Sequence, residues 1–76
     1  MIDVYKGKRG LVGIDACVAP TLAAEMLAAM MHGAALEIYA CQEREGGMVG
    51  IDAQVSASVA ARVLTKAELA GVQIRR

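Results

Sequence analysis

The sequence contains no phenylalanine and no tryptophan, and its two tyrosines bring the aromatic content to only 3%. Large aromatic rings normally supply much of the burial in a small core. Their scarcity leaves the 76-residue chain to build its core from Ala, Val, Leu, Ile and Met side chains, which dominate its 57% hydrophobic content. A domain of this size buries only about 60% of its unfolded surface. We therefore expect one domain, residues 1–76, that gains further burial by contact with other copies of itself.

The sequence also lacks an excess of one charge and a cluster of metal ligands. Eight basic and eight acidic residues give no net charge, which argues against nucleic acid or an acidic membrane as a partner. Two cysteines, Cys17 and Cys41, with His32 as the one histidine, do not have the spacing of a zinc site. We expect no cofactor and no metal.

No long apolar run marks a membrane span or a signal peptide. The start MIDVYKGKRG has no apolar stretch, and the apolar window 16–36 is interrupted by polar residues and glycine. We therefore expect a cytoplasmic protein with free thiols and no membrane partner.

One five-residue sequence, VGIDA, occurs twice, at 12–16 and at 49–53. With a shift of 37 positions, residues 10–27 align with residues 47–64 without gaps, and ten of the 18 positions are identical. A match of this kind is typical of an internal repeat. We interpret the chain as internally duplicated, with a 37-residue repeat and pseudo-two-fold halves at about 2–38 and 39–76.

The repeat predicts the same order of elements in each half. Helices are expected at about Pro20–His32 and Ala57–Ala70, each followed by a glycine, with Pro20 in the first turn of one and Ser56 or Ser58 as the cap of the other. Strands are expected at the following ranges: Ile2–Lys6, Leu11–Ala16, Leu36–Gln42, Met48–Ala53 and Val72–Arg75.

The order β-βαβ-βαβ predicts an α+β fold, a ferredoxin-like split β-α-β sandwich with an extra N-terminal strand. Val12, Ile14 and Ala16 should face the helices. The first and last strands, Ile2–Lys6 and Val72–Arg75, compete for one position in the sheet. One of them should therefore extend the sheet or pair across a subunit boundary.

The two predicted helices differ on their outer sides. The second is amphipathic, with Val59, Ala60, Val63, Leu64 and Ala67 facing the sheet. The first turns Leu22, Ala23, Met26, Leu27 and Met30 inward, but its outer side is apolar as well, with Ala24, Ala28, Ala29 and Met31. A helix that is apolar on nearly all sides is buried on nearly all sides. We predict a homo-oligomer interface that includes the following residues: Leu22, Ala24, Ala28, Met31, Val4 and Ile74. The alternative is an exposed Ala-rich helix, which helix propensity favours.

Asp15 and Asp52 occupy equivalent positions in the two copies. Paired carboxylates serve in acid–base catalysis and in metal binding. We expect antiparallel neighbours to hold these two at opposite ends, where they cap turns or pair with basic groups. Cys17 as a nucleophile would need a base nearby, and His32 lies at the far end of the intervening helix. These patterns predict no catalytic residues.

Three further positions concern the outer face of the sheet. Cys41 is expected there, in alternation with Tyr39 and Glu37. Gly13 and Gly50 leave space over the central strands, which a tyrosine, Tyr5 or Tyr39, a ligand or a partner chain could fill.

The segment ALEIYACQEREGGMV resembles the second hairpin of bacterial microcompartment shell domains: a strand, a short charged and Gly-rich loop, and an apolar strand before a capped helix. Upstream, GIDA followed by LAAEMLAAMM is similar to the family's first strand and its Ala/Met-rich helix, so the resemblance covers about residues 13–64. It implies a ferredoxin-like fold and cyclic hexamers. It also implies a central pore lined by the loop residues Glu43, Arg44, Glu45, Gly46 and Gly47.

Together these patterns predict a non-enzymatic, self-assembling structural protein that forms a homo-oligomer, cyclic and shell-like if the resemblance extends to assembly. One alternative is a regulatory module of the same fold that binds a small polar ligand at subunit edges. Another is a small enzyme subunit that uses Asp15, Asp52 or Cys17.

Overall fold

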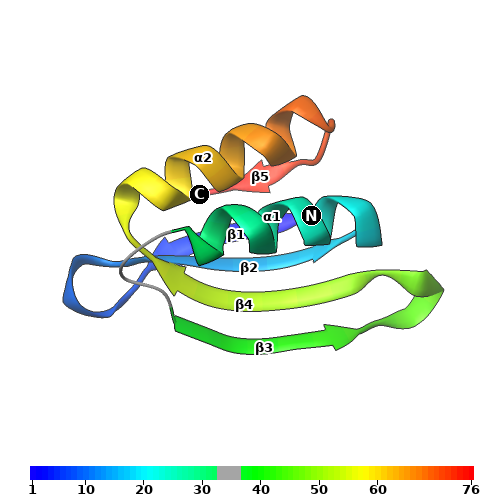
Figure 1. The fold of residues 1–76 in the computed structure, drawn as a ribbon, viewed down its shortest axis with the longest axis horizontal. Coiled ribbons are helices and arrows are strands. Elements are labelled where there is room, and N and C mark those ends of the chain that lie inside the picture. Colours follow the sequence, from blue (N-terminus) through cyan, green and yellow to red (C-terminus); the bar gives the residue numbers. More distant parts are fainter. Residues whose placement is uncertain (33–36) are drawn as a thin grey trace.

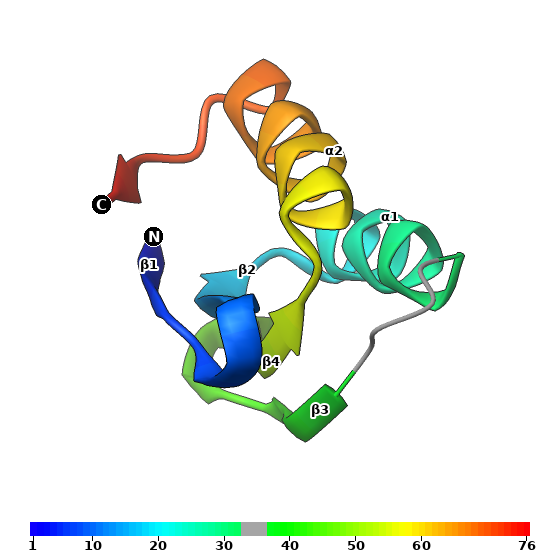
Figure 2. The same cartoon turned by 90° about the vertical axis from the view of Figure 1, so that its left-hand side faces the viewer.

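The computed structural model describes residues 1–32 and 37–76. Within them, five strands form one mixed sheet and two helices cover one of its faces, as Figures 1 and 2 show. This confirms the predicted α+β class. The elements are β1 (Ile2–Lys6), the 3₁₀ turn η1 (Lys8–Gly10), β2 (Val12–Val18), α1 (Pro20–Met31), β3 (Glu37–Glu43), the 3₁₀ turn η2 (Glu45–Gly47), β4 (Val49–Val55), α2 (Ala57–Leu69) and β5 (Ile74–Arg75).

The strand order is β3-β4-β2-β1-β5. β1 pairs antiparallel with β2 over five residue pairs, and β5 runs parallel to β1 over two. The first strand therefore takes the position beside β2, because the short η1 turn makes β1 and β2 a hairpin, and the last strand extends the sheet. Both strands that competed for one position in the sequence are accommodated within one chain.

Helix boundaries follow local signals. α2 begins after Ser56, whose hydroxyl accepts a hydrogen bond from the Val59 backbone N–H (3.4 Å), and the chain turns away at Gly71 with φ of 79°. α1 begins at Pro20 and ends at Met31, one residue earlier than predicted. The predicted stop at Gly33 and the predicted strand start at Leu36 lie outside the described residues.

The core lies between the helices and one face of the sheet. α1 packs over β4, and α2 packs over β2 and β5. Val12, Ile14 and Ala16 face the helices as predicted, and the buried set also contains all five inward residues predicted for α2. One prediction for α1 is wrong, because Ala29, expected outside, is buried at 8% exposure beside the second helix.

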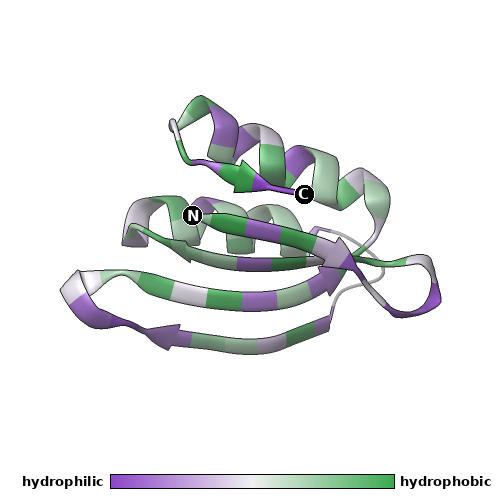
Figure 3. Cartoon of the chain, turned by 180° about the vertical axis from the view of Figure 1, so that it is seen from behind, coloured by the Kyte–Doolittle hydropathy of each residue, from purple (hydrophilic) through white to green (hydrophobic). Residues whose placement is uncertain are grey.

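Figure 3 shows the difference between the helices in hydropathy: α1 is apolar along most of its length, while polar and apolar residues alternate along α2. Among the described residues, neither helix is long and apolar enough to cross a membrane.

Candidate functional site

Both helices lie on one face of the sheet and leave the other face open (Figure 2). The strand register places three aspartates on this open face. Asp15 on β2 lies directly opposite Asp52 on β4, and Asp3 on β1 lies opposite Asp15 on its other side. The prediction that Asp15 and Asp52 lie at opposite ends is wrong. The register pairs Val12 with Val55, which makes the two aspartates the central pair of β2 and β4.

Two of these three carboxylates have polar partners. The guanidinium of Arg75 donates two hydrogen bonds to Asp3, at 2.7 and 3.0 Å. The hydroxyl of Tyr5 donates to Asp52 at 2.7 Å. Burial, and next the hydrogen bond to Asp52, raise the pKa of the Tyr5 phenol. In the described part of the chain, no three His, Cys, Asp or Glu side chains are grouped so that they could hold a metal ion. In this row Asp3 and Asp52 each have a polar partner within the chain, and Asp15 lies between them.

The space over the two strand glycines is filled by side chains of the same chain. The Tyr5 ring lies over Gly13, its cross-strand partner, so closely that a methyl group there would overlap the ring. The Arg44 guanidinium lies over Gly50 in the same way. Tyr39, the other tyrosine considered, instead donates its hydroxyl to Glu37, which also accepts from Arg9 at 2.6 Å. No ligand or partner is needed to fill either space.

The two cysteines lie on opposite faces of the sheet. Cys17 is exposed and pairs with Gly50 on the open face, whereas His32 caps the C-terminus of α1 on the other side. The two are not neighbours. Cys41 pairs with Ile51, a core residue, so it faces the helix side and the prediction that it lies on the outer face is wrong. A β-bulge between Ile38 and Ala40 shifts the alternation by one residue.

The loop that the resemblance to shell domains places at a pore consists of η2 and the two residues before it, Glu43 and Arg44. All five residues are exposed, and Gly46 and Gly47 have positive φ values of 73° and 74°, which glycine adopts without strain. The Arg44 backbone N–H donates to Met48 at 2.7 Å and closes the hairpin. Because the Arg44 side chain folds back over Gly50, the charges left at the tip are Glu43 and Glu45.

The residues predicted for a homo-oligomer interface fall into three environments. Leu22 is 7% exposed and belongs to the core of the single chain. Val4 and Ile74 are half-buried on strands that are neighbours in the sheet. Ala24, Ala28 and Met31 are exposed on α1, with Met31 at 72%.

An uncovered apolar surface lies between α1 and the free edge of the sheet. The flank of α1 that faces α2 carries Ala28 and Ala29, whereas Ala24, Leu27 and Met31, at i, i+3 and i+7, lie on the opposite flank. This flank faces β3, because α1 packs over β4 and β3 is the next strand outward. We call the following residues the edge surface: Ala24, Leu27, Met31, Ile38 and Cys41. Leu27, which was predicted to face inward, is half-buried and also packs against the core.

The sequence did not identify the β3 part of the edge surface. Ile38 is 41% exposed on the helix side of β3, where it pairs with the core residue Ala53, and α1 packs mainly over β4 rather than over this strand. An isoleucine in an alternating strand is normally assigned to the core. Only the position of β3 at the sheet edge, which depends on the complete strand order, leaves Ile38 exposed.

Comparisons of the chain with protein-family models, with curated proteins and with solved structures found no match.

Proposed function

We propose that this chain is a non-enzymatic structural protein that assembles with copies of itself through the edge surface. The observation that carries the proposal is that Ile38 and Cys41, on the helix-side face of β3, are exposed beside an apolar flank of α1. A second copy brought to the same edge would cover both. The opposite edge is a poor candidate, because β5 has two residues and Arg75 is paired with Asp3.

The faces of β3 determine how two copies pair. The bulge puts Ile38 and Cys41 on the helix side, and it puts Glu37, Ala40 and Gln42 on the open side. In an antiparallel pair, opposed residues must share a face. Of the antiparallel self-pairings that use most of Glu37–Glu43, the one that places Ile38 opposite the second copy's Cys41 keeps every opposed pair on one face. It also places Glu37 opposite Gln42, so that no like charges are opposed.

The proposed contact is isologous and closes at two chains. A cyclic, shell-like ring with η2 at its centre, as the resemblance to microcompartment shell domains implies, would need a head-to-tail contact instead. The mass of the oligomer in solution separates these two arrangements.

We also propose that the fold is a duplicated, ferredoxin-like sandwich with β1 inserted between β2 and β5. Two observations support this. The order β2-α1-β3-β4-α2-β5 follows the split β-α-β plan, and equivalent residues of the two repeats, Asp15 and Asp52, are direct partners in the sheet.

The test of the interface uses disulfide formation between chains. In a Cys17→Ser parent, Ile38→Cys places a thiol opposite the second copy's Cys41, within the range that a disulfide spans. Mild oxidation should convert most of this variant to a covalent dimer on a non-reducing gel. Tyr39→Cys is the matched control: it adds a thiol one residue away, on the other face, and should give little dimer.

Equal crosslinking of both variants would exclude this register. Sedimentation of the unmodified chain provides the second readout, because a monomer at micromolar concentration would exclude self-assembly altogether. Met31→Lys should shift the equilibrium toward monomer. Leu69→Lys, which changes a side chain that is 84% exposed elsewhere on the helix layer, should not.

A further inference from the structure

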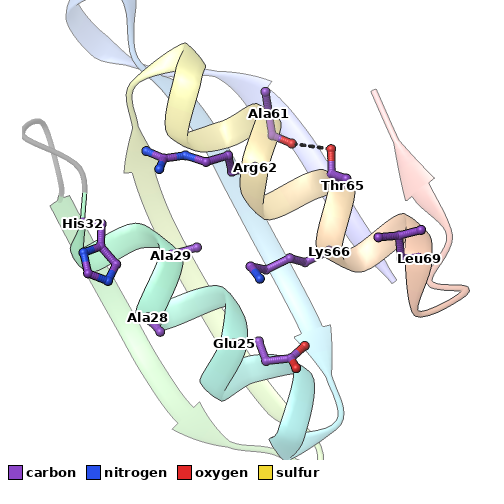
Figure 4. A pocket seen from close by; sticks show the side chains of 9 residues that line it. All are labelled: Glu25, Ala28, Ala29, His32, Ala61, Arg62, Thr65, Lys66 and Leu69. Carbon is purple, nitrogen blue, oxygen red and sulfur yellow. Dashed lines mark hydrogen bonds between the residues drawn. The ribbon is translucent and has the colours of Figure 1, made fainter.

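A second exposed surface lies on the other flank of α1, where the two helices form a groove of about 660 Å³ on the side away from the sheet. Small or apolar side chains line it along its length, and Leu69 at one end is 84% exposed. Its lining residues are shown in Figure 4: Glu25, Ala28, Ala29, His32, Ala61, Arg62, Thr65, Lys66 and Leu69.

The groove has different charges on its two walls. α2 contributes Arg62 and Lys66, one helical turn apart, and Figure 4 shows both side chains extending from α2 toward the α1 side. α1 contributes Glu25 and His32, which lie at opposite ends of the groove wall that this helix forms. The ion pairs within the described residues involve other groups, namely Arg9–Glu37, Arg75–Asp3 and Arg76–Glu68. Both cations of the α2 wall are thus available to a partner.

The form of the groove favours a helix over a small molecule. Sites for small ligands enclose most of the ligand, whereas most residues of this groove are exposed and leave it open to solvent along its outer side. A floor of alanines admits a ridge of protruding side chains, which is how an amphipathic helix sits in a groove. Two cations one turn apart complement two carboxylates at i and i+4 on such a helix.

A second copy of this chain does not offer that pattern. α1 carries one carboxylate, Glu25, and α2 carries one, Glu68, so neither helix has two acids one turn apart. We propose that the groove binds an amphipathic helix of a different protein, with an apolar stripe bordered by two acidic residues one turn apart. This inference is independent of the edge surface, which lies on the opposite flank of α1.

The proposal can be tested with a defined probe. A fluorescent helical peptide of alanine and leucine, carrying two glutamates four residues apart beside its leucine stripe, is titrated with the full chain at low salt. A second peptide replaces both glutamates with lysine. The acidic peptide should bind about tenfold more tightly than the basic one.

Charge reversal gives the matched variants. Lys66→Glu should weaken binding of the acidic peptide about tenfold and strengthen binding of the basic one, whereas Lys8→Glu, which reverses an exposed cation of η1, should change neither. Equal affinity for both peptides, or equal losses in the two variants, would overturn the proposal.

Two further outcomes would also overturn it. Binding of phosphatidylserine vesicles that depends on Lys66, without peptide binding, would identify a membrane surface instead. A Lys66→Glu variant that sediments at a lower mass than the unmodified chain would identify the groove as a contact between copies. The crosslinking through Ile38→Cys does not involve the groove, so failure of one proposal is distinguishable from failure of the other.

Discussion

Asp15 lies directly opposite Asp52 in the sheet, although like charges in this position repel each other. Asp52 accepts a hydrogen bond from Tyr5, and Asp3, the other neighbour of Asp15, is paired with Arg75. In the described part of the chain, Asp15 itself has no side-chain hydrogen bond or ion pair. It is therefore the member of the row whose charge is least compensated.

Asp15→Asn should accordingly stabilise the protein, by about 0.5 kcal/mol, because the amide keeps the shape and removes the repulsion. Urea unfolding at neutral pH measures the free energy of unfolding of the variant and of the unmodified chain. The gain in stability should shrink at 1 M salt, where charges are screened. Asp3→Asn is the control and should give no gain, since it breaks the contact with Arg75. A loss of stability in Asp15→Asn would mean that the Asp15 carboxylate makes a favourable contact, and it would contradict the repulsion with Asp52.

The close approach of Tyr5 to Gly13 predicts a coupled pair of mutations. Gly13→Ala should destabilise the protein by about 1–3 kcal/mol, because the new methyl group displaces the ring and its hydrogen bond to Asp52. In a Tyr5→Ala background the same change should cost nothing or stabilise slightly, since alanine in a strand is favoured over glycine by about 0.5 kcal/mol. A double-mutant cycle from urea unfolding measures the coupling, and additive effects would contradict the contact.

Both tyrosines should make the fold sensitive to alkaline pH. Burial and the bond to Asp52 raise the pKa of Tyr5, and the bond to Glu37, followed by desolvation, raises the pKa of Tyr39. A phenol with a higher pKa in the folded state stabilises the fold while it is protonated. That stabilisation is fully present below the unfolded value of about 10 and is lost as the pH rises through the folded value.

Thermal unfolding followed from neutral to strongly alkaline pH should therefore show a falling Tm above about pH 10, with a smaller fall in Tyr5→Phe and Tyr39→Phe. The sequence has no tryptophan, so the ultraviolet absorbance of phenolate reports these two side chains directly. Titration of both tyrosines at the value of a free phenol would contradict the two hydrogen bonds.

Local signals predicted the elements of this fold well, because the cues lie within a few residues of each boundary. Pro20 and Ser56 mark the helix starts correctly, and the alternation at Val12, Ile14 and Ala16 gives the buried face of β2. The order of the elements and their approximate bounds could thus be predicted from the sequence.

Features that depend on contacts between distant elements could not be predicted. The bulge beside Tyr39 arises where β3 pairs with β4, and it moves Cys41 to the helix side with no sign in the sequence of β3. Ala29 is buried because α2 lies beside it, which a helical pattern read in isolation cannot indicate. The edge surface was missed in part for the same reason.

Equivalent positions before the two helices give a final, matched prediction. Ala19 precedes α1 and Ser56 precedes α2 with nearly the same backbone angles, φ of −63° in both and ψ of 150° and 157°. Ser56 caps its helix and Ala19 provides no side-chain cap. Ser56→Ala should therefore cost about 1 kcal/mol, and Ala19→Ser should gain about 0.5–1 kcal/mol, because the backbone already has the conformation that a capping serine adopts. Urea unfolding of both variants measures the two changes in the free energy of unfolding. If Ala19→Ser gives no gain while Ser56→Ala is costly, the start of α1 is held by packing rather than by its cap.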